Sequence, residues 1–183
     1  MPEPKQFLFR EDLIRLLPVG ARIAELGVQY GYFSAIIHYI NHPKELVLVD
    51  AWRHFPGPYR GQGNVGDEEQ EKIRQFVTDK FLPYPNVRVV HSMTHDAATL
   101  FPDGHFDCVY IDASHFLEDI RQDLIDWYPK VKSGGLFCGH DYWQVNVPYI
   151  QVKEAVDEFC VQNGLNLDYI TLGHCGSWGL WKP

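Results

Sequence analysis

Two short stretches of the sequence each place an aspartate close to a histidine. The stretch YIDASH ends an apolar run with Asp112 and supplies His115 three positions later, and the stretch GHDYW contains His140 and Asp141. Carboxylates that lie close together repel each other, and a hard divalent cation such as Mg2+, Mn2+ or Ca2+ relieves that repulsion. A histidine titrates near neutral pH and can remove a proton from a reacting group. The two stretches therefore predict a site that binds a cation and transfers a proton.

Each of these side chains also has a structural explanation. Asp112 could cap the helix that follows it, although Ser114 is better placed for that role. His115 could be a surface residue in the first helical turn. His140 could be a third ligand, a hydrogen-bonding partner or a buried histidine with a backbone partner, and its structural roles are favoured over ligation. For Asp112, His115 and Asp141 together a functional role is favoured, because convergence of three polar groups is difficult to explain by folding alone.

The apolar runs before these stretches belong to a repeating pattern. Short runs rich in branched residues alternate with segments of helical period, which predicts a parallel sheet with crossover helices. The predicted strands are 21–26, 46–50, 87–91, 107–112 and 135–140, followed by two more near 168–172 and 177–182. The last two follow each other directly and predict a closing antiparallel hairpin. Because strands 107–112 and 135–140 should be neighbours, Asp112 and Asp141 should converge at the carboxyl edge of the sheet.

Helices are predicted between the strands by four apolar stripes at helical spacing. The stripes run from Phe33 to Ile40, Ile73 to Val77, Phe116 to Trp127 and Val152 to Cys160. Residues 1–19 are expected to form an N-terminal helical segment that could cover the sheet or pack on another subunit. Residues 51–69 are dense in glycine and proline. We expect them to form a lid loop, because they leave the carboxyl end of a strand, where open parallel sheets bind ligands.

The stretch AELGVQYGYFS, residues 24–34, runs from a strand through a glycine turn into a helix. Gly27 and Gly31 allow unusual backbone angles and close approach of a ligand, and the helix start offers free amide groups. Taken alone, this glycine turn could equally be a ligand-binding turn or a tight turn that binds no ligand. The pattern is not G-x-G-x-x-G, so the pyrophosphate cradle of a dinucleotide enzyme is incomplete. Glu25 precedes Gly27 by two positions, and Asp50 ends the next strand, where a carboxylate can accept both ribose hydroxyls.

With these features the sequence resembles the class I S-adenosylmethionine-dependent methyltransferases, whose first motif is an acidic residue followed by glycines. Residues 101–143 resemble the group that includes bacterial sugar and macrolide-sugar O-methyltransferases, through the patterns Y-I-D-x-x-H, D-L-x-x-W-x-P, G-G and H-D-Y. Together these similarities cover most of residues 20–143. The resemblance implies an α/β fold in a single domain spanning residues 1–183. This fold is a Rossmann-like seven-stranded sheet, mostly parallel with a C-terminal antiparallel hairpin and helices on both faces.

The resemblance also implies which residues bind the cofactor, S-adenosylmethionine. These residues are Glu25, Gly27, Val28, Gly31, Ser34, Asp50, Ala51, Trp52, Ser92, Met93 and Asp112. Glu25 and the two glycines would bracket the methionine part, Asp50 would hold the ribose, and Ser92 and Met93 would lie near the adenine. Many relatives have an acidic residue near that last position, so contact by Met93 would be apolar. The Trp52 ring could stack on a purine or an acceptor, or it could be a half-buried aromatic under the lid.

In metal-dependent relatives, aspartates at these positions hold a cation that also chelates the acceptor's hydroxyls. The resemblance therefore implies that Asp112 and Asp141 bind Mg2+ or Mn2+ and that His115 is the general base. The methyl group would pass in one in-line displacement to an acceptor with vicinal oxygens, as in sugars and catechols, with sugars favoured. Aromatic residues of the lid and of the segment after residue 140 could pack against a sugar ring: Trp52, Phe55, Tyr59, Trp143 and Tyr149.

The composition limits the classes of partner. The chain has 183 residues, 45% of them hydrophobic, enough for one buried core with little room for a second domain. Its formal net charge of -8 disfavours binding to nucleic acid or anionic lipid. No stretch has the character of a signal peptide or approaches the roughly 20 apolar residues that span a bilayer. We therefore expect a cytoplasmic protein, as a monomer or a homo-oligomer, with a small-molecule acceptor and no nucleic acid or membrane partner.

Two other functions are compatible with parts of the sequence. The first is a non-catalytic module that binds S-adenosylmethionine and serves as a partner or regulatory subunit, but the intact set of Asp112, His115 and Asp141 argues against it. The second is a nicotinamide-dependent oxidoreductase, which the missing G-x-G-x-x-G and the predicted terminal strand pair disfavour. The four cysteines lie far apart without a CxxC spacing, so neither a disulfide framework nor a zinc site is predicted.

Overall fold

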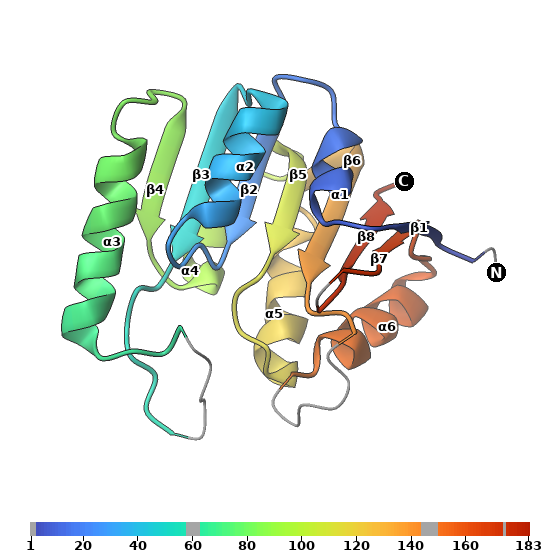
Figure 1. Ribbon diagram of the computed structural model, residues 1–183. Helices are drawn as coiled ribbons and strands as arrows, with labels where there is room; N and C mark the ends of the chain where they lie inside the picture. Colours follow the sequence, from blue (N-terminus) through green and yellow to red (C-terminus); the bar gives the residue numbers. More distant parts are fainter. Residues whose placement is uncertain (1–2, 58–62, 144–149, 174) are drawn as a thin grey trace.

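The computed structural model describes residues 3–57, 63–143, 150–173 and 175–183, which form one sheet of eight strands with helices on both faces (Figure 1). The strands are β1 (Lys5–Phe7), β2 (Arg22–Leu26), β3 (Glu45–Asp50), β4 (Val87–His91), β5 (Phe106–Ile111), β6 (Val131–His140), β7 (Tyr169–Thr171) and β8 (Ser177–Trp181). The helices are α1 (Glu11–Arg15), α2 (Tyr32–Asn41), α3 (Asp67–Phe81), α4 (Thr94–Ala98), α5 (Leu117–Trp127) and α6 (Val152–Asn163).

The order of strands across the sheet is β1-β7-β8-β6-β5-β2-β3-β4. Neighbours from β6 to β4 are parallel, whereas β8 runs antiparallel to both β6 and β7. The seven predicted strands are present, and the prediction of a mostly parallel sheet closed by an antiparallel pair is confirmed. The crossovers between parallel strands contain helices, as the alternating sequence pattern indicates.

The N-terminal segment differs from its prediction as a helix. Residues 5–7 form β1, which pairs in parallel with β7 and adds an eighth strand at the edge of the sheet, and only Glu11–Arg15 are helical within residues 3–19. Three residues are too few to show the alternation that marks a strand. Strand β1 therefore forms because it pairs with β7, and its own sequence does not predict it. The short helix α4 is a second element that the sequence pattern does not predict.

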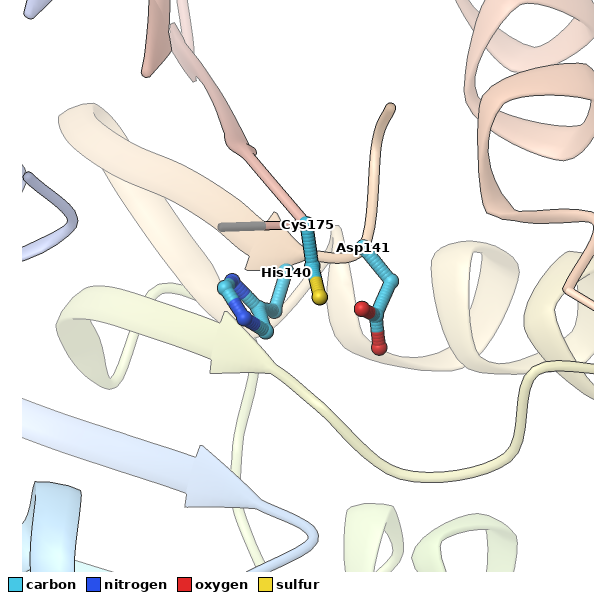
Figure 2. A group of neighbouring side chains, drawn as sticks. All are labelled: His140, Asp141 and Cys175. Atoms are coloured by element: carbon cyan, nitrogen blue, oxygen red, sulfur yellow. The ribbon is translucent and has the colours of Figure 1, made fainter. Parts of the chain in front are cut away.

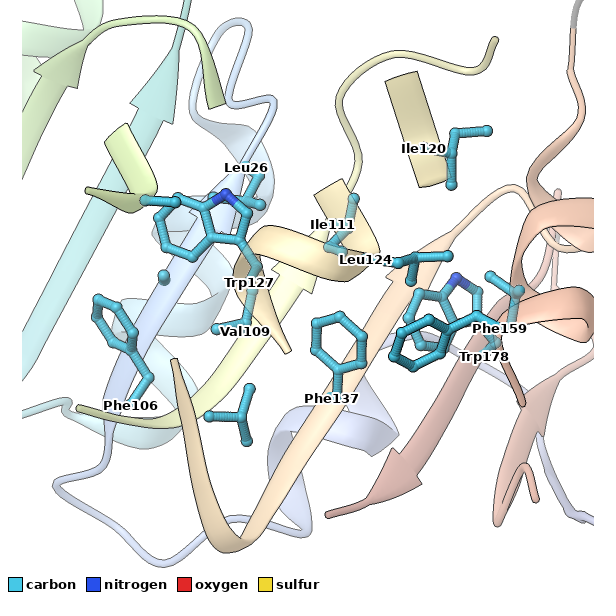
Figure 3. Packing of buried hydrophobic residues seen from close by; sticks show 14 of the residues in the cluster. Leu26, Phe106, Val109, Ile111, Ile120, Leu124, Trp127, Phe137, Phe159 and Trp178 are labelled. Carbon is cyan, nitrogen blue, oxygen red and sulfur yellow. The ribbon is translucent and has the colours of Figure 1, made fainter. Parts of the chain in front are cut away.

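The sheet has a core on each face, because successive side chains of a strand point to opposite sides. One core lies under α1, α2 and α3 and includes Leu13 and Ile14 of α1, both fully buried. The other lies under α4, α5 and α6 and contains large aromatic side chains, among them Trp127 and Trp178 (Figure 3). Burial of one large aliphatic side chain contributes roughly 1.5–3 kcal/mol. The two residues of α1 therefore hold this short helix on the sheet.

The parallel strands end at one edge of the sheet, where the loops after β2 and β5 touch. The Asp112 N–H donates to the Leu26 carbonyl at 2.7 Å. Gly27 has a φ of +83°, and a Cβ at this position would lie 2.0 Å from the Asp112 carbonyl oxygen. Only glycine fits such a contact at such an angle, so Gly27 fixes the position of Asp112 beside the glycine turn.

No helix in the described ranges is long and apolar enough to cross a membrane.

Candidate active site

Asp112, His115 and Asp141 converge at the carboxyl edge of the sheet, as their positions in the sequence predict. The Nε2 atom of His115 is 2.8 Å from Oδ2 of Asp141 and 3.9 Å from Oδ1 of Asp112. The shorter distance is not an aligned hydrogen bond, since this buried Nε2 has no hydrogen-bond partner among the described residues. The nitrogen therefore lies close to two carboxylates and can still bind a third group.

The two carboxylates control the protonation of His115. Burial alone would lower the pKa of His115, but Asp112 and Asp141 outweigh it and raise the pKa to about 9. Burial would likewise raise the pKa of Asp141, but the neighbouring His115 outweighs it and lowers that pKa. With these groups alone, His115 is protonated at neutral pH and cannot accept a proton. A role as base requires a positive group that offsets the charge of the carboxylates.

The three side chains fit a hard divalent cation. One ligand atom from each lies within 4.8 Å of the others. The Nε2 atom of His115 can serve as a third ligand or as a proton acceptor, but not as both at once, because a metal-bound nitrogen has no free lone pair. Asp112 and Asp141 supply the oxygen ligands that Mg2+ and Mn2+ prefer.

The backbone at this edge is strained at several positions that are not glycine. Gln29, Trp52, Asp141 and Cys175 have φ angles of 50°, 33°, 59° and 67°. These residues lie in the loops that follow β2, β3, β6 and β7. The left-handed region costs a non-glycine residue roughly 1 kcal/mol or more, and such strain gathers at ligand sites. This independent feature supports the carboxyl edge as the functional site.

His140 and Cys175 flank Asp141 at the end of β6 (Figure 2). The Nδ1 atom of His140 is 2.9 Å from the Ser177 hydroxyl, which lies 3.1 Å from the Tyr110 hydroxyl. One ring nitrogen of His140, the Cys175 sulfur and one Asp141 carboxylate oxygen lie within 4.8 Å of one another, so this group could also hold a metal ion. The contact with Ser177 matches the role of His140 as a hydrogen-bonding partner, and a role as a third ligand stays open.

Glu25 and Ser34, both implied to lie near the methionine part of the cofactor, are in direct contact. Glu25 is 2% exposed and accepts a hydrogen bond of 2.5 Å from the Ser34 hydroxyl. Burial raises the pKa of Glu25 to about 8, and the hydrogen bond from Ser34 opposes this only in part. Glu25 is therefore mostly neutral at pH 7. A cationic group of a ligand would favour its ionised form.

Asp50 is held by the backbone around it. Its Oδ2 accepts the N–H groups of Val28 and Gln29, and its Oδ1 accepts that of Trp52, each at 2.8 Å. Burial raises the pKa of Asp50, and the hydrogen bonds from the backbone oppose that rise. Contact between Asp50 and the ribose hydroxyls stays a prediction.

The Trp52 ring lies in the core under α1, α2 and α3 and is 4% exposed. Its Nε1 donates to the Gln29 carbonyl at 3.0 Å. A ring so fully covered has no free face for a purine, so the stacking role expected of Trp52 is not supported. The structure matches the alternative, an aromatic side chain buried beneath the loop. The adjacent Ala51 carbonyl lies 2.8 Å from Nε2 of His91.

Ser92 and Met93 follow β4 at the same edge. The Ser92 N–H donates to the Asp50 carbonyl at 3.0 Å, which ties the end of β4 to the end of β3. Met93 precedes α4 and is 39% exposed. An exposed apolar side chain is free to contact a flat ring, so contact between Met93 and the adenine stays a prediction.

The loop of residues 51–69 is described over 51–57 and 63–69, and polar contacts join its two ends. The Asn64 side chain accepts the Phe55 N–H and donates to the Phe55 carbonyl, each at 2.8 Å. The His54 N–H donates to Asp67 at 2.7 Å. These contacts hold the described part of the loop against the start of α3. Its function as a lid stays a prediction.

Among the aromatic residues expected to contact an acceptor, Tyr59 and Tyr149 lie outside the described residues. Trp143 follows β6 and is 42% exposed, and its Nε1 donates to the Thr171 carbonyl at 3.1 Å. The hydrogen bond fixes the ring while much of its surface stays open. Trp143 is therefore available as a packing surface beside Asp141.

Arg10 is a residue of this edge that the sequence does not indicate. Its Nη1 is 3.4 Å from Oδ2 of Asp112, and its guanidinium lies 4.0 Å from the centre of the Phe33 ring. Its positive charge also lowers the pKa of Glu25, against the larger effect of burial. An arginine before a short helix carries no local signal of function. Its position depends on how α1 packs on the sheet.

Comparison with known sequences gives a family match and one distant relative. Residues 24–142 match a protein family described as a methyltransferase domain. The chain is also 22% identical, over 159 residues and 80% of its length, to uncharacterized protein y4gI of Sinorhizobium fredii. It spans 17% of the length of that relative.

Several solved structures share the fold. A provisionally named caffeoyl-CoA O-methyltransferase of Staphylococcus aureus has 17% identity and a TM-score of 0.69, with 94% of this chain and 80% of that chain covered. The O-methyltransferase NovP has 20% identity and a TM-score of 0.66, with coverage of 94% and 79%. The methyltransferase PaMTH1 of Podospora anserina, solved with SAH bound, has 13% identity and a TM-score of 0.62, with coverage of 88% and 72%. At these identities the likeness establishes the fold.

Proposed function

The chain belongs to the class I S-adenosylmethionine-dependent methyltransferases, and on that basis we propose that it methylates a hydroxyl group of a small acceptor with the help of a divalent cation. The observation that carries this proposal is the convergence of Asp112, His115 and Asp141 where the parallel strands end. O-methyl transfer needs a group that removes the hydroxyl proton and a charge that stabilises the oxygen. These three side chains can provide both.

Glu25, Ser34 and the turn from Gly27 to Gly31 are proposed to hold the methionine part of the cofactor. The Ser34 hydroxyl orients the Glu25 carboxyl, which would pair with the methionine ammonium group. Asp50, oriented by backbone amides, would hold the ribose. S-adenosylmethionine, when bound, supplies the methyl group that passes to the acceptor oxygen.

His115 is proposed as the general base. Its unpartnered Nε2 faces the carboxylates and would take the proton of the acceptor hydroxyl as the oxygen acquires the methyl group. The protein forms no covalent intermediate in this scheme. Its contribution is the placement of the two substrates and the control of charge around the reacting oxygen.

Asp112 and Asp141 are proposed to hold Mg2+ or Mn2+. A cation bound there would lower the pKa of an acceptor hydroxyl and offset the negative charge that keeps His115 protonated. Asp141 is well placed for this, since it is 7% exposed and fixed in a left-handed backbone conformation. The loop contact between Gly27 and Asp112 positions the other carboxylate beside the cofactor turn.

The proposed acceptor is a sugar or glycoside with vicinal hydroxyls. Two adjacent oxygens can chelate one cation, and the resemblance to sugar O-methyltransferases favours sugars over catechols. The exposed Trp143 ring beside Asp141 offers an apolar surface for a sugar ring. The loop of residues 51–69 is the other segment proposed to contact the acceptor.

The test is formation of S-adenosylhomocysteine from S-adenosylmethionine with a panel of sugars, glycosides and a catechol, using metal-stripped protein and added Mg2+. The proposal predicts turnover on vicinal hydroxyl acceptors that rises with Mg2+. A turnover rate that does not change with added Mg2+ would show that methyl transfer does not depend on this cation. Cofactor binding without turnover on any acceptor would favour the non-catalytic binding module instead.

A further inference from the structure

Arg10 places a positive charge among the carboxylates of the candidate site. Its guanidinium is 3.4 Å from Asp112, and it affects the protonation of Glu25. These two carboxylates end β2 and follow β5, the strands that meet at Gly27. Arg10 therefore lies at the junction of the cofactor turn and the catalytic residues.

The methionine part of S-adenosylmethionine carries both an ammonium group and a carboxylate. The ammonium group suits an edge that contains Glu25, Asp50, Asp112 and Asp141, but the carboxylate would be repelled there unless a cation meets it. We propose that Arg10 binds the carboxylate of the cofactor's methionine part. This inference rests on the proposed function, because it assumes that the cofactor binds at this edge.

The geometry of Arg10 suits this role. The guanidinium lies on the Phe33 ring, in the first turn of α2, which fixes its plane. Its hydrogen bond to Asp112 is long, its side chain also contacts Tyr110, and the planar fork of an arginine has further N–H groups that can bind a carboxylate in a bidentate way. The side chain of Arg10 is 28% exposed, so a ligand can reach it.

The fold also explains why Arg10 stays in place. It is the residue before α1, and its carbonyl accepts the Leu13 N–H at 3.1 Å. Leu13 and Ile14 are fully buried and anchor α1 on the sheet beside α2 (Figure 1). A helix of five residues has little stability of its own, so the packing of Leu13 and Ile14 in the core keeps α1 and the preceding Arg10 in place.

Lys80 is a second basic side chain close to the cofactor turn, and it already contacts backbone carbonyls. Its Nζ donates to the Gly31 carbonyl at 2.6 Å and lies 3.5 Å from the Tyr30 carbonyl. It approaches the turn from α3, whereas Arg10 approaches from α1 and contacts Asp112. Lys80 therefore holds the turn, and Arg10 is the better partner for a ligand carboxylate.

The experiment compares two ligands that differ only in that carboxylate. S-adenosylhomocysteine and its decarboxylated analogue, S-adenosyl-3-thiopropylamine, are titrated calorimetrically into the wild-type protein and into Arg10→Gln. We expect Arg10→Gln to weaken S-adenosylhomocysteine binding by roughly ten- to a hundred-fold, the range for a hydrogen bond to a charged group. Binding of the analogue should be the same in both proteins. Arg10→Lys should recover part of the lost affinity, since it keeps the charge without the fork.

Arg15→Gln is the matched control, because Arg15 belongs to the same helix but is exposed and pairs with Asp12. It should leave both affinities unchanged. If Arg10→Gln weakens the binding of both ligands equally, the inference is overturned. Arg10 would then have a structural role or would neutralise the charge of Asp112. If Arg10→Gln does not fold, the same comparison is made with Arg10→Lys, and an equal change for both ligands again overturns it. Failure of wild-type protein to bind S-adenosylhomocysteine would instead overturn the proposed function.

Discussion

The polar side chains in the two halves of the carboxyl edge differ in their hydrogen-bond contacts. In the half formed by β2 and β3, Glu25 accepts the Ser34 hydroxyl and Asp50 accepts three backbone amides. In the half formed by β5 and β6, His115 lies close to Asp112 and Asp141, yet its Nε2 has no aligned partner within the described residues. We call the first the cofactor half and the second the catalytic half, after their proposed roles. The carboxylates of both halves have contacts within the protein, but only the catalytic half contains a buried nitrogen without an aligned hydrogen bond among the described residues.

This difference indicates what each half is built for. Carboxylates held by the protein's own donors give the cofactor turn a definite shape before any ligand arrives, which reduces the cost of binding. The buried Nε2 of His115 interacts with two carboxylates through charge but has no aligned hydrogen bond among the described residues. Such a nitrogen is typical of a site where a ligand completes the contacts. Changes in the catalytic half should therefore affect turnover, and changes in the cofactor half should affect stability and cofactor binding.

The largest effect is expected from His115→Ala. Loss of a general base lowers turnover by on the order of a hundred- to ten-thousand-fold, whereas S-adenosylhomocysteine affinity should stay unchanged because the cofactor half is intact. Rates of methyl transfer and calorimetric affinities would be measured side by side. His95→Ala is the control, since His95 is exposed and pairs with Asp126 on α5. Wild-type turnover in His115→Ala would show that His115 is not the general base.

A smaller effect is expected from Asp141→Asn on metal binding. Replacing one of two anionic ligands should weaken Mn2+ binding by roughly ten- to a hundred-fold, at least as much as loss of an outer-shell contact. Mn2+ affinity can be measured by electron paramagnetic resonance of the free ion. Asp103→Asn, at a side chain that is 73% exposed, should have no effect. Equal Mn2+ affinity in wild type and Asp141→Asn would contradict a metal site at this carboxylate.

The cofactor half predicts a dependence of stability on pH. Because the pKa of Glu25 is raised to about 8 in the folded protein, from 4.5, the folded state keeps a proton that the unfolded chain loses as pH rises. Stability from this group is present below the unfolded pKa and decreases as pH rises towards 8. Between about pH 5.5 and about pH 7, the wild type should lose about 2 kcal/mol more than Glu25→Gln.

Urea unfolding at several pH values would measure that loss. Asp123, whose burial raises its pKa to about 7, adds to the dependence in both proteins and cancels in the comparison. Glu68→Gln is the control, because the Glu68 side chain is 89% exposed. The same pH profile in wild type and Glu25→Gln would show that Glu25 is ionised in the folded protein.

The smallest effect is expected from Trp52→Phe. The change removes the hydrogen bond from Nε1 to the Gln29 carbonyl and should lower the free energy of unfolding by about 1 kcal/mol. Because the ring is buried, S-adenosylhomocysteine affinity should stay within about twofold of wild type, well below the effect of losing a direct contact. Thermal unfolding and calorimetry would measure the two quantities. A large loss of affinity with little loss of stability would restore the stacking role of Trp52.

The sequence predicts the catalytic half better than its surroundings. Asp112 and Asp141 follow long apolar strands, and parallel strands place their carboxyl ends together, so local pattern is enough to predict their meeting. The same reasoning places Asp50 at the edge, but it does not show that three amides already occupy its carboxylate. Those contacts depend on the backbone path of two loops.

Arg10 and Trp52 show where sequence reasoning fails. Arg10 reaches Asp112 only because α1 docks on the sheet, and that docking depends on tertiary packing between segments distant in the chain. For Trp52 the sequence leaves two roles open, stacking on a ligand or burial under the loop, and only the packing of the folded chain shows that the ring is buried. Strand β1 is likewise formed by pairing with β7. In each case a long-range contact decides the outcome.

The central claim is that this edge binds S-adenosylmethionine and uses Asp112, His115 and Asp141 for transfer. The most direct measurement is a calorimetric titration of the protein with S-adenosylhomocysteine, with and without Mg2+. The account predicts micromolar binding at one site, retained in His115→Ala. No binding in either condition would contradict it, and the convergence of Asp112, His115 and Asp141 would then belong to a metal site with other chemistry.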